Sequence, residues 1–139
     1  MTNQAQAELI EEFSFLDGWM DRYQYLIDLG RTLSPLEAGE KVDANKLSGC
    51  QSQVWLLGEL DGGLMRYRAN SDAAIVSGLI AVLLRVYDGL SPEEVLATEP
   101  EFITALGFDT HLSPTRSNGL AAMLTAIKNL ARASLAGVA

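Results

Sequence analysis

Two strand-like runs separated by Asp61-Gly62-Gly63 constrain the fold of this chain more than any other feature. The runs cover residues 53–60 and 64–69, and large apolar side chains recur in both. The two glycines supply the positive φ angles that a tight turn between antiparallel strands needs. The sequence therefore predicts a β-hairpin near the middle of the chain.

Helical patterns precede and follow this hairpin. Apolar residues recur at near-helical spacing from Gln4 to Asp17, and Asp17 is expected to cap a second helix that stops near Gly30. Asn70-Ser71-Asp72 offers caps for a third helix, apolar on nearly all sides, that stops near Asp88-Gly89. We expect this third helix to be the buried centre of the domain.

The rest of the chain is helical apart from an irregular arm over residues 31–48. Ser91-Pro92-Glu93-Glu94 predicts a short capped helix, residues 102–107 predict another, and Ser113-Pro114 begins a long amphipathic helix. Helices at both ends, a hairpin between them and no βαβ alternation indicate an α+β fold. We expect one domain over residues 1–139, with helices covering one face of a small antiparallel sheet.

The net charge of -8 excludes some partner classes. Nucleic acids and anionic membranes attract Lys and Arg, so neither is an expected partner. The first residues have no basic start and no apolar run, and the longest apolar stretch, around residues 75–86, is too short to cross a bilayer. A cytoplasmic protein is expected.

Cys50 is the only cysteine, and it lies where a polar segment enters the first strand. Gly49 leaves space on one side of the sulfur, and reactive groups are often found on loops that join rigid elements. A single cysteine in a cytoplasmic protein is, however, commonly a small buried apolar residue. One cysteine forms no internal disulfide and holds no zinc or cluster by itself, so no metal is expected.

Three stretches together resemble the SufE family of cysteine desulfuration proteins, including the similar CsdE group. They are Gly49-Cys50-Gln51-Ser52-Gln53-Val54-Trp55, the run from Ser71-Asp72 to Val82, and His111-Leu112-Ser113-Pro114-Thr115-Arg116-Ser117-Asn118-Gly119-Leu120. The likeness runs in register over nearly the whole chain and is loose in the first forty and last ten residues. It implies a fold shared with IscU-type cluster scaffolds.

The resemblance also implies a function in iron–sulfur cluster assembly. Cys50 would accept sulfane sulfur from a SufS- or CsdA-type cysteine desulfurase, carry it as a persulfide, and pass it to a SufBCD-type scaffold. The pyridoxal phosphate belongs to the desulfurase, and no cofactor is expected on this chain, which would act as a monomer or weak homodimer. We expect a sulfur-transfer partner of the desulfurase rather than an independent enzyme.

Four further residues are candidates for partner binding or loop positioning, each with a structural alternative. Gln51 could hydrogen-bond to a thiolate or simply form a strand edge. Asp72 is first a helix cap and second a group that holds the cysteine loop or meets the partner. Arg116 falls in the first turn of a helix, where a cation is disfavoured, so it either contacts the desulfurase or pairs with Asp109 or Asp72. His111, the only histidine, is a candidate base, although ordering the turn before the last helix is slightly favoured.

Two other classes of function remain open at this stage. A stand-alone cysteine hydrolase would use Cys50 and His111 with an acid such as Asp72, and it would need the base within about 3 Å of the sulfur. A binding module with an incidental cysteine is the third alternative.

Overall fold

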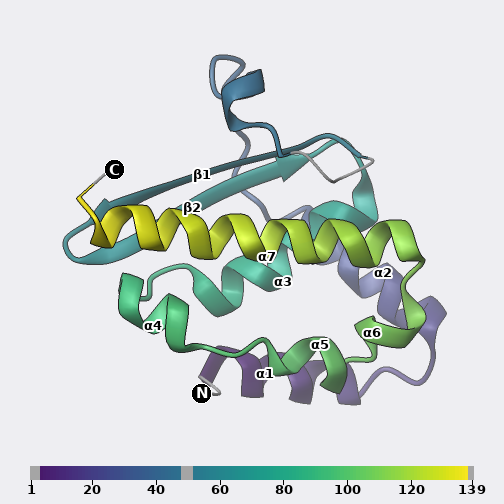
Figure 1. The fold of residues 1–139 in the computed structure, drawn as a ribbon. Coiled ribbons are helices and arrows are strands. Elements are labelled where there is room, and N and C mark those ends of the chain that lie inside the picture. Colours follow the sequence, from purple (N-terminus) through teal and green to yellow (C-terminus); the bar gives the residue numbers. More distant parts are fainter. Residues whose placement is uncertain (1–3, 48–51, 138–139) are drawn as a thin grey trace.

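The structure is a computed structural model that describes residues 4–47 and 52–137 (Figure 1). The elements in chain order are α1 (Gln4–Ser14), α2 (Trp19–Gly30), the 3-10 helix η1 (Asp43–Asn45), β1 (Val54–Asp61), β2 (Leu64–Ser71), α3 (Ala74–Tyr87), α4 (Pro92–Ala97), α5 (Glu101–Ala105), α6 (Phe108–His111) and α7 (Pro114–Leu135). The predicted α+β architecture is confirmed.

The central hairpin forms as predicted. β1 and β2 pair antiparallel from Val54 opposite Ser71 to Asp61 opposite Leu64. Gly62 and Gly63 adopt φ angles of 61° and 84°, in the left-handed region that favours glycine. The alternation of a strand then places its buried side chains on one face of this sheet.

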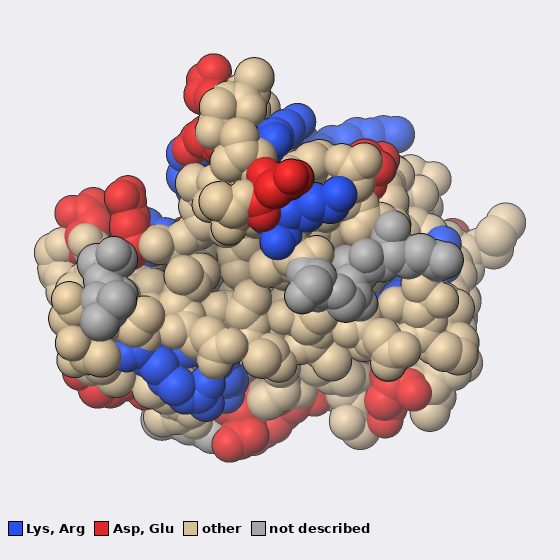
Figure 2. Space-filling model, turned by 45° about the horizontal axis from the view of Figure 1, so that its top comes forward, with Lys and Arg blue, Asp and Glu red and all other residues tan. Residues whose placement is uncertain are grey.

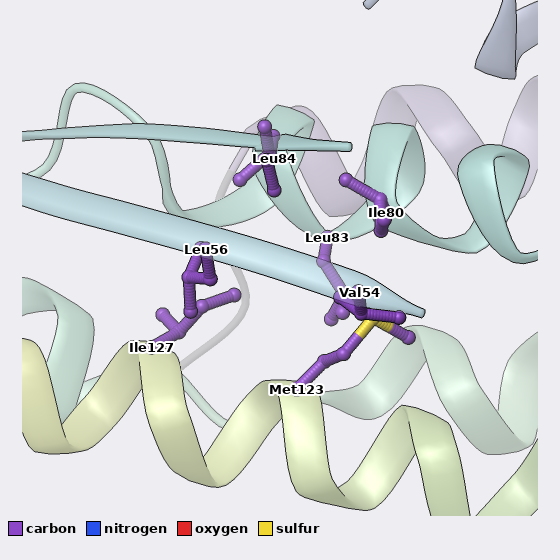
Figure 3. A pocket seen from close by; sticks show the side chains of 8 residues that line it. Val54, Leu56, Ile80, Leu83, Leu84, Met123 and Ile127 are labelled. Carbon is purple, nitrogen blue, oxygen red and sulfur yellow. The ribbon is translucent and has the colours of Figure 1, made fainter. Parts of the chain in front are cut away.

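That face packs on α3 and α7 (Figure 1). Figure 3 shows side chains from β1, α3 and α7 around one small pocket, among them Val54, Leu83, Met123 and Ile127. The space they leave is about 10 Å³, which is barely enough for one water. The Tyr67 hydroxyl adds a polar tie by donating to the Ile127 carbonyl at 2.8 Å, and burial raises the pKa of Tyr67. This layer is closed core and offers no room for a substrate.

α3 is the most buried helix in the described chain, as expected, and α2 crosses it closely. Gly30 ends α2 as predicted, but its φ is not positive. A Cβ on Gly30 would lie 2.8 Å from the Gly78 amide nitrogen. Gly30 is therefore needed for the approach of α3 and not for a left-handed helix stop.

Two predicted helix caps are wrong. The residue before α2 is Gly18, and Asp17 makes no capping contact. The residue before α3 is Ala73, because β2 continues to Ser71 and the helix begins only after the strand pairing has ended. The predicted capping box does form at α4, where Ser91 accepts a hydrogen bond from the Glu94 amide and Glu94 accepts one from the Ser91 amide.

The arm over residues 31–47 lies against the other face of the sheet and is held by β2. The Asn70 side chain accepts a hydrogen bond from the Leu36 amide at 3.1 Å and donates one to the Ser34 carbonyl at 3.0 Å. Arg68 pairs with Glu40 at 2.5 Å. Figure 2 shows acidic and basic side chains side by side where the arm stands on the sheet, while most of this face is uncharged.

Within residues 4–47 and 52–137, no helix has the length and apolar character that a membrane-spanning segment requires.

Candidate functional site

A groove of about 620 Å³ lies where the chain enters β1, between the first turns of α3 and α7. Four separate parts of the chain line it: Ile27 of α2, Ser52 before β1, residues 73–76 at the start of α3, and Ser113, Thr115 and Arg116 at the start of α7. A smaller recess of about 30 Å³ shares Ser52, Val76, Thr115 and Arg116 with the groove and reaches Met123. The groove therefore combines apolar walls with hydroxyl groups and one cation.

The chain is fixed on both sides of residues 48–51. On one side the Leu47 amide donates to the Val54 carbonyl at 2.9 Å. On the other side, the Gln53 amide donates to a carboxylate oxygen of Asp72 at 3.0 Å. The Asp72 amide in turn donates to the Gln53 carbonyl at 3.4 Å. Cys50 and Gln51 lie outside the described residues, so their predicted roles stay predictions.

Asp72 is exposed, and its observed contact links the end of β2 to the residue before β1. The contact replaces the helix cap expected for Asp72, while the second expected role, holding the cysteine loop or meeting the partner, stays a prediction. Its carboxylate extends the strand pairing by one more hydrogen bond, at the base of the segment that carries Cys50.

Arg116 lies in the first turn of α7, as predicted. The Ser113 hydroxyl caps this helix by accepting a hydrogen bond from the Arg116 amide at 3.3 Å. The half-buried Arg116 side chain lines both the groove and the recess. The ion pairs found among the described residues do not include Arg116, so its expected pairing with Asp72 or Asp109 is not seen there.

His111 ends α6, and its exposed ring stacks on the indole of Trp19 with centroids 4.3 Å apart and an interplanar angle of 22°. Its carbonyl accepts a hydrogen bond from the Tyr23 hydroxyl at 2.9 Å. His111 does not line the groove. These contacts match the role of ordering the turn before α7, which the sequence slightly favoured.

The sequence did not single out Ile27 or Thr115 as part of a site. Ile27 follows Tyr23 at a spacing of four residues, a pattern that we interpreted as a core stripe of this helix. The side chains of Tyr23 and Ile27 are, however, only half-buried. In the part of the chain that the structure describes, no group of three or more His, Cys, Asp or Glu residues comes together in a way that would hold a metal ion.

Comparisons with known proteins agree with this architecture. A model of the SufE family, described as an Fe-S metabolism associated domain, matches residues 7–131. An uncharacterized SufE-like protein of Rhizobium etli is 39% identical over 130 residues, which cover 90% of this chain and 88% of the relative. Another, of Rhizobium meliloti, is 37% identical over 133 residues, covering 92% and 95%. The solution structure of a hypothetical protein from Thermus thermophilus superposes with a TM-score of 0.81 at 25% identity, over 98% of this chain and 99% of that one.

Proposed function

The chain belongs to the SufE family of Fe-S metabolism associated domains, and we propose that it accepts sulfur from a pyridoxal-phosphate-dependent cysteine desulfurase and activates that enzyme. Cys50 carries the sulfur as a persulfide and hands it to a SufBCD-type cluster scaffold in the cytoplasm. The chain makes no sulfur itself, and the pyridoxal phosphate that releases sulfur from cysteine belongs to the desulfurase.

The transfer is a thiol–disulfide type exchange without net oxidation. The Cys50 thiolate attacks the outer sulfur of the donor persulfide, so a new S–S bond forms at Cys50 while the S–S bond of the donor breaks. The donor cysteine leaves as a thiolate with the electron pair of that bond. The rate depends on the thiolate fraction of Cys50 and on access to its sulfur.

The observation that carries the proposal is the groove beside Ser52. Cys50 precedes Ser52 by two residues in the sequence, and two residues of extended chain span at most about 7 Å, so we propose that sulfur transfer takes place at this groove. On either side of the segment that carries Cys50, Leu47 is hydrogen-bonded to Val54 and Gln53 to Asp72, so both ends of the segment are held by the hairpin. Arg116 at the groove can attract the negative charge of a thiolate or persulfide.

The alternative of a stand-alone cysteine hydrolase is not favoured. Its candidate base, His111, stacks on Trp19 and is not among the groove residues. Membership of a family associated with Fe-S metabolism also supports sulfur transfer over hydrolysis.

Intact-mass analysis tests the proposal. The protein is incubated briefly with a cysteine desulfurase, its pyridoxal phosphate and free cysteine. We expect a reducible gain of about 32 mass units on Cys50, the mass of one sulfur in the exchange described. The gain should be absent without the desulfurase and absent in the Cys50→Ser variant.

The same variant separates the three classes of function. A carrier loses stimulation of the desulfurase in Cys50→Ser while its fold is kept. A hydrolase would act without any partner, and a binding module would show no effect of the substitution. An unchanged mass with desulfurases shown to be active would overturn the carrier assignment.

A further inference from the structure

The two most exposed large apolar side chains of the described chain lie close together in the sequence, Phe15 on the connection between α1 and α2 and Met20 in the first turn of α2. Phe15 is 77% exposed and Met20 is 86% exposed, whereas Val42, Leu60 and Leu135 are 41–48% exposed. Single exposed apolar residues are common on protein surfaces. Two so close together in the sequence are unusual, because each leaves most of its side chain in water.

This connection is held on a rigid base. The Arg22 guanidinium turns inward and donates to the Leu106 carbonyl at 3.1 Å and the Phe13 carbonyl at 3.4 Å. Trp19, between the two exposed residues, stacks on His111. We call Phe15, Trp19, Met20 and His111 the α1–α2 patch. Because its base is fixed, a partner that covers it loses little conformational entropy in ordering it.

The patch is continuous with the groove beside Ser52. Trp19, Tyr23 and Ile27 are spaced four residues apart on one side of α2, and Ile27 lines the groove. The Tyr23 hydroxyl binds the His111 carbonyl, two residues before the Ser113 cap of α7. Figure 1 shows the α1–α2 connection, α6 and the start of α7 at the same end of the molecule. The patch and the groove are therefore linked along one side of α2, at one end of the molecule.

The acidic side chains around the patch indicate which charge a partner surface should carry. Asp17, Asp21 and Asp109 are exposed next to it, and the ion pairs seen within the described residues include none of them. The nearby cation, Arg22, is occupied by backbone carbonyls. A partner surface complementary to the patch is apolar where it covers Phe15 and Met20 and carries Lys or Arg opposite the three aspartates.

We propose that the α1–α2 patch is a docking contact for the sulfur-donating desulfurase, and that the desulfurase meets it with an apolar surface edged by Lys or Arg. This inference rests on the proposed function. A second copy of this chain fits less well, because a two-fold contact would place the three aspartates against their own copies. We assign the patch to the donor, because the proposed function requires the donor to dock at the groove linked to the patch along α2, and an effect on the downstream scaffold alone would contradict this assignment.

The test uses a patch variant and a matched control. The patch variant is Phe15→Ser with Met20→Ser, and the control is Leu60→Ser with Leu135→Ser, at the hairpin turn and the end of α7, which Figure 1 shows at the opposite end of the molecule. The rate of persulfide formation on Cys50 is measured against protein concentration. We expect the patch variant to raise KM at least fivefold with kcat at saturation unchanged, and the control to match the wild type.

Binding is measured separately by titration calorimetry with Cys50→Ser, which exchanges no sulfur. Adding the patch substitutions should weaken binding to the desulfurase at least fivefold, and added salt should weaken wild-type binding. If the wild type gains sulfur but the patch variant equals it in KM and affinity, the patch proposal is wrong and the sulfur-carrier proposal stands. If the wild type neither gains sulfur nor binds, both are wrong.

Two other results would also overturn the patch proposal by naming a different occupant. One is a wild-type dimer in light scattering that the patch substitutions convert to a monomer. The other is an effect confined to sulfur transfer from Cys50 to the scaffold. Because both side chains are exposed, circular dichroism of the patch variant should match that of the wild type.

Discussion

Gly78 of α3 lies directly against the backbone of Leu26 in α2. A Cβ built on Gly78 would stand 2.1 Å from the Leu26 carbonyl oxygen and 2.8 Å from the Leu26 Cβ. Because a backbone carbonyl in a helix has little freedom to move, the two helices keep this close crossing only with glycine at position 78. The crossing positions Ile27 on the wall of the groove.

We therefore expect Gly78→Ala to destabilise the protein by about 1–3 kcal/mol, the usual cost of overpacking a tight contact. Urea unfolding measures the change. Gly39→Ala is the matched control, because a Cβ at Gly39 meets no atom within 4 Å and should change the free energy of unfolding little. Equal stabilities of the two variants would contradict the importance of the crossing.

The sequence predicted the elements better than the contacts between them. Helical and strand patterns are local, so the hairpin, α3 and α7 were found from spacing and turn residues alone. Gly30 was interpreted as a helix stop, since nothing local reveals that Gly78 of another helix lies against it. The α6 helix was missed, because four residues carry too little pattern to be recognised.

The same limit applies to the site. Arg116 was recognised by its locally unfavourable place in a first helical turn, a signal that the sequence itself contains. For Asp72 the sequence ranked a helix cap above a role near the cysteine loop, because its observed partner, the Gln53 amide, lies 19 residues earlier and comes close only when β1 and β2 pair. Ile27 and Thr115 became site residues only when α2 and α7 were brought together.

Asp72→Ala should loosen the base of the segment that carries Cys50. The substitution removes the oxygen that accepts from the Gln53 amide, a hydrogen bond worth about 0.5–1.5 kcal/mol. We expect faster hydrogen exchange at the Gln53 amide, measured by NMR, with little change in global stability. Asp72→Asn keeps an acceptor oxygen and should exchange more slowly than Asp72→Ala. Unchanged exchange in both variants would show that this contact does not hold the segment.

The ion pair between Glu12 of α1 and Arg85 of α3 should make stability depend on acid pH. Two hydrogen bonds at 2.8 and 2.6 Å from Arg85 lower the pKa of Glu12 from 4.5 to about 2. Since the folded pKa is the lower one, the stabilisation is present above pH 4.5 and is lost as the pH falls toward 2. Both side chains are about one-third exposed, so solvent screening limits the contribution to about 1 kcal/mol.

Glu12→Gln should accordingly be less stable than the wild type near neutral pH, and the two should converge in acid. Denaturant unfolding across this pH range measures the difference. Asp28→Asn is the control, because its pair with Arg31 is well exposed and should contribute little at any pH. A constant difference between Glu12→Gln and the wild type from neutral pH to acid would mean that the ion pair is not its origin.

Arg116→Ala should impair sulfur transfer by weakening the encounter with the donor. The guanidinium lines the groove without an ion-pair partner among the described residues, so it is available to an incoming persulfide. We expect KM in the desulfurase assay to rise about tenfold, or about 1.4 kcal/mol, with a smaller change in kcat. Arg132→Ala removes the same charge from the far end of α7, where Arg132 contacts Asn129, and should leave KM unchanged. Both substitutions remove one positive charge from α7, but only Arg116 lines the groove. Equal effects of the two variants would therefore indicate that the net charge of the protein, and not the position of Arg116, governs the encounter.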